Sequence, residues 1–443
     1  MSNSLLIYSP KITSRHQYIF KVLLNEIYFI EYSLTDDLDL FIASNKVKIN
    51  YSDHPICEEE FFIKKHGLLD QKGIHQIDIK VDYLNNMPYF FIAYHANSYN
   101  FDIFSASFYL ITRYEEYLPH LKDRYNRYRP EESLSFRNGF LNKPIVNLWL
   151  KDFICELQDR FPDLIIKSPK FQYISTIDID TAYLYKGKSF IRSLALLFRY
   201  IINFDFKEIK MYFSVIFNKR KDPFDTYSLQ FNLQKKYQLD VCYFVLLGDY
   251  GLNDKNISYT NRIFQILIKR LADFANVGLH PSFGSTFKHD NLNLEIHRLE
   301  NIQKREVIFS RQHFLQLSFP DTYRRLINAG ITNDYTMGYA SQLGFRAGIA
   351  TPYTFYNLDT EEILAIKVYP FAIVDDTLRF NMKLHPNQVI DNIKDLIKSV
   401  KDVNGTLITI WHNDTFSEKG VWKGWRNVYE EMIKLIKINN GNN

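Results

Sequence analysis

A regular alternation of strand-like and helix-like segments fills the chain from residue 169 to residue 443 and constrains its fold more than any other feature. Strands that alternate with helices of about 10–15 residues form parallel βαβ units. The short apolar runs expected as strands are 173–179, 241–247, 277–280, 307–310, 334–337, 345–349, 368–374 and 406–411. The segments expected as helices are 227–237, 261–276, 292–305, 320–329 and 386–403. So many parallel strands in one region fit a β/α barrel better than an open sheet.

The sequence changes character near residue 168, which we take as a domain boundary. Before this point, short runs alternate between apolar and polar residues, and longer stretches show helical spacing. The strands and helices expected there are 5–8, 77–81, 103–117 and 146–160. We therefore predict an N-terminal α+β accessory domain over residues 1–168 and a barrel over residues 169–443.

The composition argues against a nucleic-acid partner and for a reducing compartment. Lys and Arg total 54 against 50 Asp and Glu, and no long basic run concentrates the small positive excess. Cys57, Cys155 and Cys242 are far apart and lack zinc-ribbon spacing, so we expect reduced thiols. The first residues do not read as a signal peptide. These features predict a cytoplasmic protein.

The apolar stretch 189–206 comes nearest to a membrane span. Arg192, Arg199 and Asp205 interrupt it, whereas a spanning helix needs about 20 predominantly apolar residues. We therefore expect no transmembrane segment and favour a buried amphipathic helix. The alternative is a helix that rests on a membrane surface as a peripheral contact.

Two carboxylates follow the first strand of the expected barrel. The chemistry of a barrel sits at the carboxyl ends of its strands, so polar residues there are candidates for function. Asp178 and Asp180 are two residues apart, which points their side chains to the same face of a strand. Such neighbours repel unless a proton or a cation lies between them. The pair predicts a metal site or a general base, and a surface hairpin is less expected because Ile177 and Ile179 are apolar.

Other strands of this region end in histidine or arginine. His280 comes directly after a buried strand and suits a metal ligand, and Ser282 and Ser285 could orient it or contact substrate. Arg311 and His313 share one face of the next strand by period two. An arginine there could hold a carboxylate or steer an anion, and pairing with a core aspartate is equally expected.

The last strand ends in Trp411 and His412. His412 fits a general acid, because imidazole titrates near neutral pH. Trp411, Trp422 and Trp425 could form a platform that binds a sugar ring. We favour a different interpretation of these tryptophans, in which they form an aromatic cluster that covers the mouth of the barrel.

Four motifs, in this order, resemble the polysaccharide deacetylase superfamily (NodB-like, carbohydrate esterase 4). They are Thr-Ile-Asp-Ile-Asp at 176–180, Gly-Leu-His-Pro-Ser at 278–282, Ser-Arg-Gln-His at 310–313 and Ile-Thr-Ile-Trp-His at 408–412. The segments similar to a bacterial subgroup with an added N-terminal domain are 110–117, 334–339 and 344–348. The resemblance to the superfamily covers roughly residues 170–440, and that to the subgroup covers most of the chain.

The resemblance implies a distorted (β/α)7 NodB-like barrel that binds a divalent metal, usually zinc, and removes acetyl groups from carbohydrate. Asp178 stands where the family has its catalytic base, and Asp180 and His280 stand where it has metal ligands. Arg311 takes the place of the arginine that positions the base. His412 takes that of the general acid.

The chain departs from the family at Gly284, where members usually carry a second metal-binding histidine four residues after the first. His313 from the neighbouring strand, Ser285 or water could complete the site, or the metal could be absent. Our favoured hypothesis is a metal-dependent hydrolase of carbon–nitrogen bonds that removes an N-acetyl group from a glycan or its precursor, with an O-acetyl group as the less expected substrate. The alternatives are a non-catalytic glycan-binding or scaffolding protein on a degenerate barrel, and an amidase of non-sugar substrates.

Overall fold

The computed structural model describes residues 4–93, 95, 98–286 and 289–438. Its N-terminal region is built on a small parallel sheet. Its strands are β1 (Ser4–Tyr8), β2 (Glu31–Thr35), β3 (Val47–Ser52), β4 (Glu60–Lys64), β5 (Asp82–Leu84) and β6 (Met87–Tyr89). The sheet has the order β2-β1-β3-β4, and β5 and β6 form a separate antiparallel hairpin. The helices here are α1 (Ser14–Phe20), α2 (Leu38–Ala43), α3 (Ile103–Ile111), α4 (Leu134–Arg137) and α5 (Ile145–Arg160).

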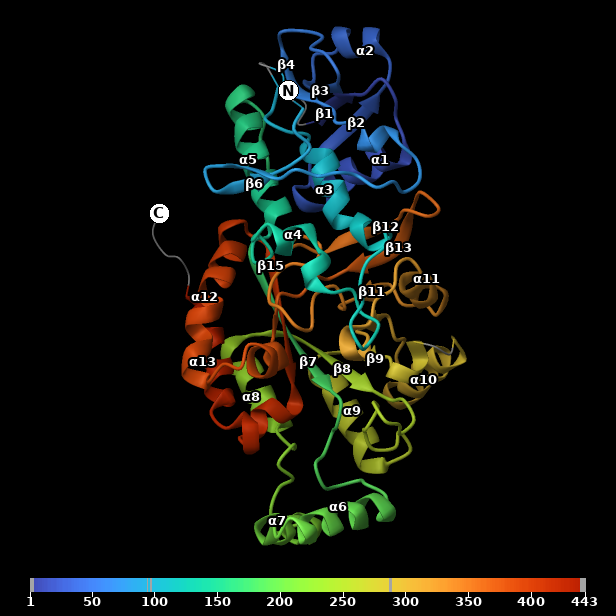
Figure 1. The fold of residues 1–443 in the computed structure, drawn as a ribbon, viewed down its shortest axis with the longest axis vertical. Coiled ribbons are helices and arrows are strands. Elements are labelled where there is room, and N and C mark those ends of the chain that lie inside the picture. Colours follow the sequence, from blue (N-terminus) through green and yellow to red (C-terminus); the bar gives the residue numbers. More distant parts are fainter. Residues whose placement is uncertain (1–3, 94, 96–97, 287–288, 439–443) are drawn as a thin grey trace.

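A larger sheet organises the rest of the chain (Figure 1). Its strands are β7 (Gln172–Ile179), β8 (Asp240–Leu246), β9 (Asn276–His280), β10 (Phe309–Ser310), β11 (Asn333–Asp334), β12 (Tyr353–Asn357), β13 (Glu362–Val368), β14 (Ile373–Val374) and β15 (Thr406–His412). They pair in the order β12-β13-β11-β10-β9-β8-β7-β15-β14. All pairs are parallel except β12 with β13, so every strand of this sheet other than β12 ends at a common edge.

Amphipathic helices follow most of these strands. They are α6 (Phe190–Ile202), α7 (Phe206–Ile216), α8 (Tyr227–Tyr237), α9 (Arg262–Phe274), α10 (His289–Gln303), α11 (Asp321–Asn328), α12 (Pro386–Asp402) and α13 (Trp425–Lys437). In α9 the buried residues Phe264, Leu267, Ile268 and Leu271 recur at helical spacing, and Asn261 caps the first turn. The helix therefore buries one apolar face, as the sequence predicts.

Most predicted elements are confirmed, and five differ. The expected strand 334–337 overlaps β11 only at Asp334, and the expected helix 103–117 ends at Ile111, before the positive φ of Arg113. The expected strand 345–349 consists of turns, because Gly344 and Gly348 adopt positive φ angles of 115° and 66°. The expected strand 368–374 is interrupted at Pro370, which has no N–H to donate to a ladder, so it is divided between β13 and β14. The expected strand 77–81 is irregular.

The closed (β/α)7 barrel is not confirmed. Within the described residues the large sheet has two edges, β12 and β14, which do not pair with each other. The backbone N–H of Phe371 donates to the carbonyl of Met337 at 3.1 Å, but the segments after β11 and before β14 form no ladder there. The fold is mixed α/β with an open parallel sheet.

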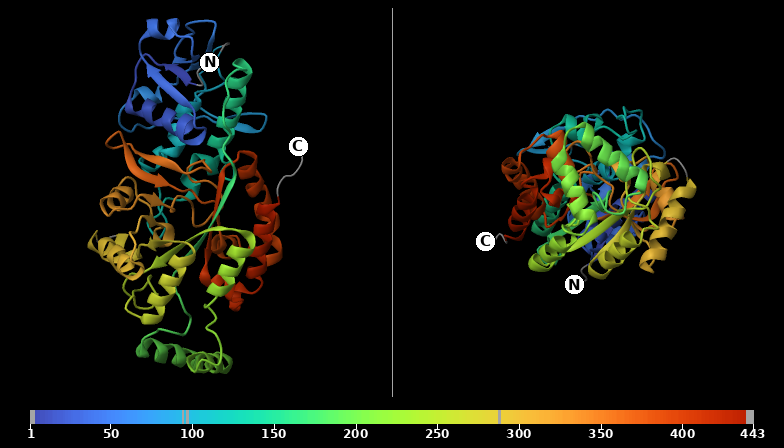
Figure 2. Two further views of the ribbon diagram at one scale, coloured as in Figure 1. Left: turned by 180° about the vertical axis from the view of Figure 1, so that it is seen from behind. Right: turned by 90° about the horizontal axis from the view of Figure 1, so that it is seen from below.

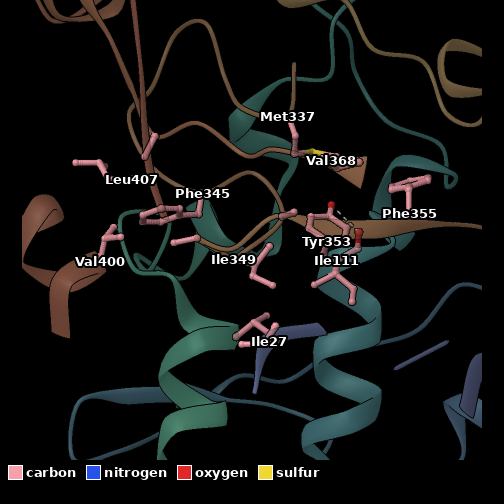
Figure 3. Close-up of a cluster of buried hydrophobic side chains, with 14 of the residues drawn as sticks. Ile27, Ile111, Met337, Phe345, Ile349, Tyr353, Phe355, Val368, Val400 and Leu407 are labelled. Atoms are coloured by element: carbon pink, nitrogen blue, oxygen red, sulfur yellow. Dashed lines mark hydrogen bonds between the residues drawn. The ribbon is translucent and has the colours of Figure 1, made fainter. Parts of the chain in front are cut away.

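The N-terminal region and the large sheet share one hydrophobic core (Figure 3). Ile27 and Ile111 come from the first region, and Phe345, Tyr353 and Leu407 come from the second. A buried ion pair also crosses between the regions: Arg346 donates to Glu116 at 2.5 Å. Arg113 of the first region donates to the same carboxylate at 2.7 Å. The division at residue 168 stays a prediction.

The stretch 189–206 is not buried, which corrects the interpretation favoured from sequence. It forms α6 and the turn into α7, and these two helices project from the end of the molecule opposite the N-terminal region (Figures 1 and 2). Most of their large apolar side chains are exposed. No helix in the described part of the chain is long and apolar enough to cross a membrane.

Candidate metal centre

Parallel pairing brings the ends of four strands together at one edge of the large sheet. In the ladders His412 lies beside Asp178, and His280 lies beside Leu246. Asp180 follows β7 directly, and His313 follows β10 after two residues. Residues as far as 234 positions apart in the sequence, such as Asp178 and His412, therefore meet because their strands run in the same direction.

Three imidazoles converge on the carboxylate of Asp180. His280 Nε2 lies 3.2 Å from Asp180 Oδ1, His313 Nε2 lies 3.5 Å from Oδ2, and His412 Nε2 lies 3.8 Å from Oδ2. One ligand atom each from Asp180, His280 and His313 lies within 4.8 Å of the others. The sequence predicted these residues as metal ligands, and the structure brings them together.

The other ring nitrogen of each histidine is already bonded. His280 Nδ1 lies 2.5 Å from the carbonyl oxygen of Arg311, and a carbonyl can only accept, so Nδ1 carries the proton. His313 Nδ1 lies 2.8 Å from Asp254 Oδ1, and His412 Nδ1 lies 2.8 Å from Asp375 Oδ1. These bonds turn the Nε2 atom of each ring toward Asp180. Such partners behind a ligand histidine fix its tautomer and orientation.

Electrostatics favours a cation at this position. Burial lowers the pKa of His313, but the carboxylates of Asp180 and Asp254 outweigh it and raise that pKa to about 9. Asp180 Oδ1 is buried and has no hydrogen-bond partner among the described residues. An unpartnered carboxylate oxygen facing imidazole nitrogens is satisfied by a proton or by a metal ion. One carboxylate and two imidazoles are a ligand set that suits zinc, so the residues present fit the metal.

Asp178 and Arg311 form a buried ion pair beside this cluster. Arg311 Nη1 donates to Asp178 Oδ1 at 2.8 Å and to Thr176 Oγ1 at 2.6 Å. The guanidinium carbon lies 4.6 Å from the centre of the Phe244 ring. Asp178 Oδ2 is left facing His280 Nε2 at 3.9 Å. Arg311 therefore pairs with a buried aspartate and holds it in place, and it does not line the cavity described below.

His412 lies in an acidic environment that the sequence analysis missed. Burial lowers its pKa, but Asp375 and Asp376 outweigh this and hold the pKa well above the usual histidine value. Burial raises the pKa of Asp376 to about 7 and that of Asp414 to about 6. A protonated His412 can therefore persist at neutral pH, as a general acid requires.

A cavity of about 480 Å³ opens at this edge of the sheet. Its lining includes Asp178, Asp180, His280, His313 and His412, together with Arg124, Tyr125, Phe314, Leu315, Phe380 and others. Phe314 and Leu315 have φ angles of 59° and 55°, rare for residues with side chains and common at functional sites. Arg124 and Tyr125 come from the N-terminal region, which therefore contributes to the wall of the cavity.

Three residues predicted to contact substrate do not line this cavity. Ser282 Oγ lies 2.5 Å from Glu295 Oε1, and Ser285 Oγ donates to the carbonyl of Ser282, so both serines hold their own loop. Trp411 is fully buried against Trp425 and other aromatic residues and presents no ring face to a sugar. A strand alternates its two faces, so when His412 points into the cavity Trp411 points into the core.

The carboxylates behind the histidines were missed for different reasons. Asp375 and Asp376 follow β14, so the rule that polar residues at strand ends are candidates could have found them. Asp254 lies in the irregular segment after β8 and gives no such signal. It accepts the backbone N–H groups of Phe283 and Gly284 at 2.9 and 3.3 Å and thus also fixes the loop after His280.

Comparison with known proteins gives a family of undefined function and distant structural neighbours. Residues 5–162, less than half of the chain, match a model described as "Family of unknown function (DUF7033)". No curated protein matches the sequence. Among solved structures, a protein of Mycobacterium smegmatis with a provisional assignment as a polysaccharide deacetylase is 12% identical with a TM-score of 0.39, over 62% of this chain and 86% of its own.

Two further neighbours are mutants of a CE4 family pseudoenzyme, one of them with restored enzymatic activity. They are 10% and 11% identical, with TM-scores of 0.25 and 0.26, over 59% of this chain and 63% and 64% of their own. Similarities this low carry no argument about fold or chemistry. What the site can do follows from its own geometry.

Proposed function

We propose that this chain is a metal-dependent hydrolase that removes the acetyl group from an N-acetylated sugar. The observation that carries the proposal is the convergence of three imidazole Nε2 atoms on Asp180, with each Nδ1 already bonded elsewhere. Asp180, His280 and His313 would hold the ion. A bound zinc ion supplies polarisation of the acetyl carbonyl and a lowered pKa for water.

Two side chains beside this centre are suited to move protons. Asp178 faces the cavity with one oxygen, while Arg311 fixes the other at 2.8 Å, so the carboxylate is oriented to accept a proton from water as it attacks the carbonyl. His412 is held by Asp375, and its Nε2 lies 3.8 Å from Asp180 Oδ2. His412 would donate a proton to the leaving nitrogen, because the nitrogen cannot depart as an anion at neutral pH.

The order of events follows from these roles. Water adds to the acetyl carbon as Asp178 takes its proton, and the carbon–nitrogen bond then breaks as His412 gives its proton to the sugar nitrogen. Acetate and a free amino sugar result. The aromatic rings of Tyr125, Phe314 and Phe380 line the same cavity and would pack against the apolar face of the sugar.

The rival hypothesis of a non-catalytic glycan-binding protein was motivated by Gly284. The position of His313 supports the catalytic hypothesis instead, because this histidine lies where it can replace the missing ligand. The N–H of Gly284 is bonded to Asp254, the carboxylate that orients His313. The loop that lacks the expected histidine is thus tied to the residue that replaces it.

The test is acetate release from N-acetylglucosamine oligomers in the presence of zinc. We expect Asp178→Asn and His412→Ala to lose activity while binding zinc nearly as the parent does, because neither is among the three ligands. Ser285→Ala is the matched control: it removes a hydroxyl near the site that does not line the cavity, and we expect full activity. Unchanged rates in both active-site variants, or bound zinc without any acetate release from the parent, would contradict the proposal.

A further inference from the structure

The helical hairpin α6–α7 exposes an unusual amount of apolar surface. Phe198, Phe204 and Phe217 have 65%, 78% and 67% of their surface exposed. The other exposed large apolar residues of the hairpin are Phe190, Ile191, Leu194, Ile201, Ile202, Phe206, Phe213 and Ile216. A water-facing surface rarely carries so many neighbouring apolar side chains without a partner.

The hairpin is nonetheless a folded structure with its own small core. Tyr185, Tyr200, Tyr212 and Val215 are buried together between its helices and the segment that leads into it. The exposed apolar residues of α6 recur at 191, 194, 198 and 201, the spacing of a single helical face. One face of the hairpin therefore packs inward, and a second apolar face stays exposed.

Basic residues surround this apolar face. Between residues 186 and 221 the sequence has nine Lys and Arg but only Asp205 and Glu208 as acidic residues. Glu208 is already engaged by Lys419 and Tyr185. The basic residues that are exposed are Arg199, Lys207, Lys210, Lys219, Arg220 and Lys221. An occupant of this face must be apolar where the phenylalanines insert and negatively charged around them.

We infer that the α6–α7 hairpin docks on an anionic lipid surface. Helices with a bulky apolar face and a basic polar face lie in the membrane interface, with the apolar residues among the acyl chains and the basic ones at the headgroups. The helices of 13 and 11 residues are too short to span a bilayer. A second copy of the chain is a poorer occupant, because a symmetric contact would bring two strongly basic surfaces together.

The hairpin lies at the same end of the molecule as the candidate metal centre. β7 carries Asp178, and the chain runs from its end down into α6 (Figure 1). The guanidinium carbon of Arg192 in α6 lies 4.1 Å from the centre of the Tyr250 ring. Leu252, two residues on and 88% exposed, lines an opening that also includes Asp180 and His412. The loop that carries Tyr250 and Leu252 thus contacts the hairpin and also lines an opening to the site.

Docking in this orientation places the cavity close to the headgroups. If the proposed function holds, on which this step rests, the substrate is an N-acetyl sugar attached to a lipid or displayed at a membrane surface. The docking itself does not depend on catalysis. It can be measured with the protein and vesicles alone.

The experiment is flotation of the full-length protein with vesicles of phosphatidylglycerol and phosphatidylcholine, compared with pure phosphatidylcholine. We expect binding to the anionic vesicles that weakens as salt is added. The triple variant Phe198→Ser, Phe204→Ser, Phe217→Ser should reduce the bound fraction at least about tenfold. The matched control is Leu38→Ser, Leu40→Ser, Ile42→Ser, three exposed apolar residues of α2 at the opposite end, and it should bind as the parent does.

Zinc binding and acetate release from a soluble oligomer keep the two proposals separate. The hairpin variant should retain both, since its substitutions are outside the cavity. Failure of the parent to bind anionic vesicles at low salt would overturn the docking proposal and leave the proposed function intact. A dimer in sedimentation velocity that the hairpin variant dissociates would also overturn it, because the face would then be covered by a second copy.

Discussion

Asp254 should control the metal affinity of the site although it does not face the metal position. Its Oδ1 lies 2.8 Å from His313 Nδ1, and the carboxylate also accepts the N–H groups of Phe283 and Gly284. Asp254→Asn keeps the shape of the side chain and removes its charge. Loss of such a partner behind a ligand histidine weakens metal binding by about 10–100-fold, or about 1.4–2.8 kcal/mol.

The assay is zinc competition against a chelating dye, with the fold checked by circular dichroism. Asp222→Asn is the matched control, because Asp222 is also a buried carboxylate that accepts backbone N–H groups, from Leu184, Tyr185 and Lys186, but holds no histidine. We expect Asp254→Asn to lose affinity and Asp222→Asn to keep it. Equal affinities for the parent and Asp254→Asn, or equal losses in both variants, would refute the reasoning.

Three other predictions concern proton transfer and stability. His412→Ala should lower acetate release by about 10²–10⁴-fold, the usual worth of a general acid, and a smaller loss than tenfold would argue against that role. Burial raises the pKa of Glu295 from 4.5 to about 7, so the folded state binds more protons than the unfolded chain between these values. Stability should therefore fall by up to about 3 kcal/mol as pH rises from 4.5 to 7, and Glu295→Gln should flatten this dependence in urea titrations; an unchanged slope would contradict it. Glu116→Gln should lower the free energy of unfolding by about 3–5 kcal/mol in the same titrations at pH 7, because the buried guanidinium groups of Arg113 and Arg346 lose the negative charge that both contact. A loss below about 1 kcal/mol would show that the two groups are solvated.

The repeated strand–helix pattern of the second region could be predicted from the sequence, because the local pattern of apolar residues identifies each element there. Runs such as 241–247 are apolar throughout, as strands covered on both faces are, and α9 shows helical spacing. Whether the sheet closes into a barrel could not be predicted from the sequence. It depends on where single residues interrupt pairing, as Pro370 does between β13 and β14, and on long-range closure that local patterns do not encode.

The candidate site was predictable to the extent that its residues end strands. Asp178, Asp180, His280 and His412 do so or follow directly, and their parallel alignment brings them together. Asp254 could not be found this way, since it reaches His313 from an irregular segment. Its role depends on tertiary placement alone.

The exposed hairpin shows a different limit of sequence analysis. An apolar stretch with scattered charges fits a buried helix and an interfacial helix equally well, because both need one apolar face. What distinguishes them is whether the protein supplies a partner for that face. In the described part of the structure, Phe198 and Phe204 have 65% and 78% of their surface exposed.

The most direct test of the account is the position of zinc in crystals of the protein, located by anomalous scattering at the zinc absorption edge. We expect a single strong peak within bonding distance of Asp180 Oδ1, His280 Nε2 and His313 Nε2, at about 2.0–2.2 Å from each. We also expect the peak to be lost in His313→Ala. Crystals grown with zinc that show no peak among these three side chains would contradict the central claim.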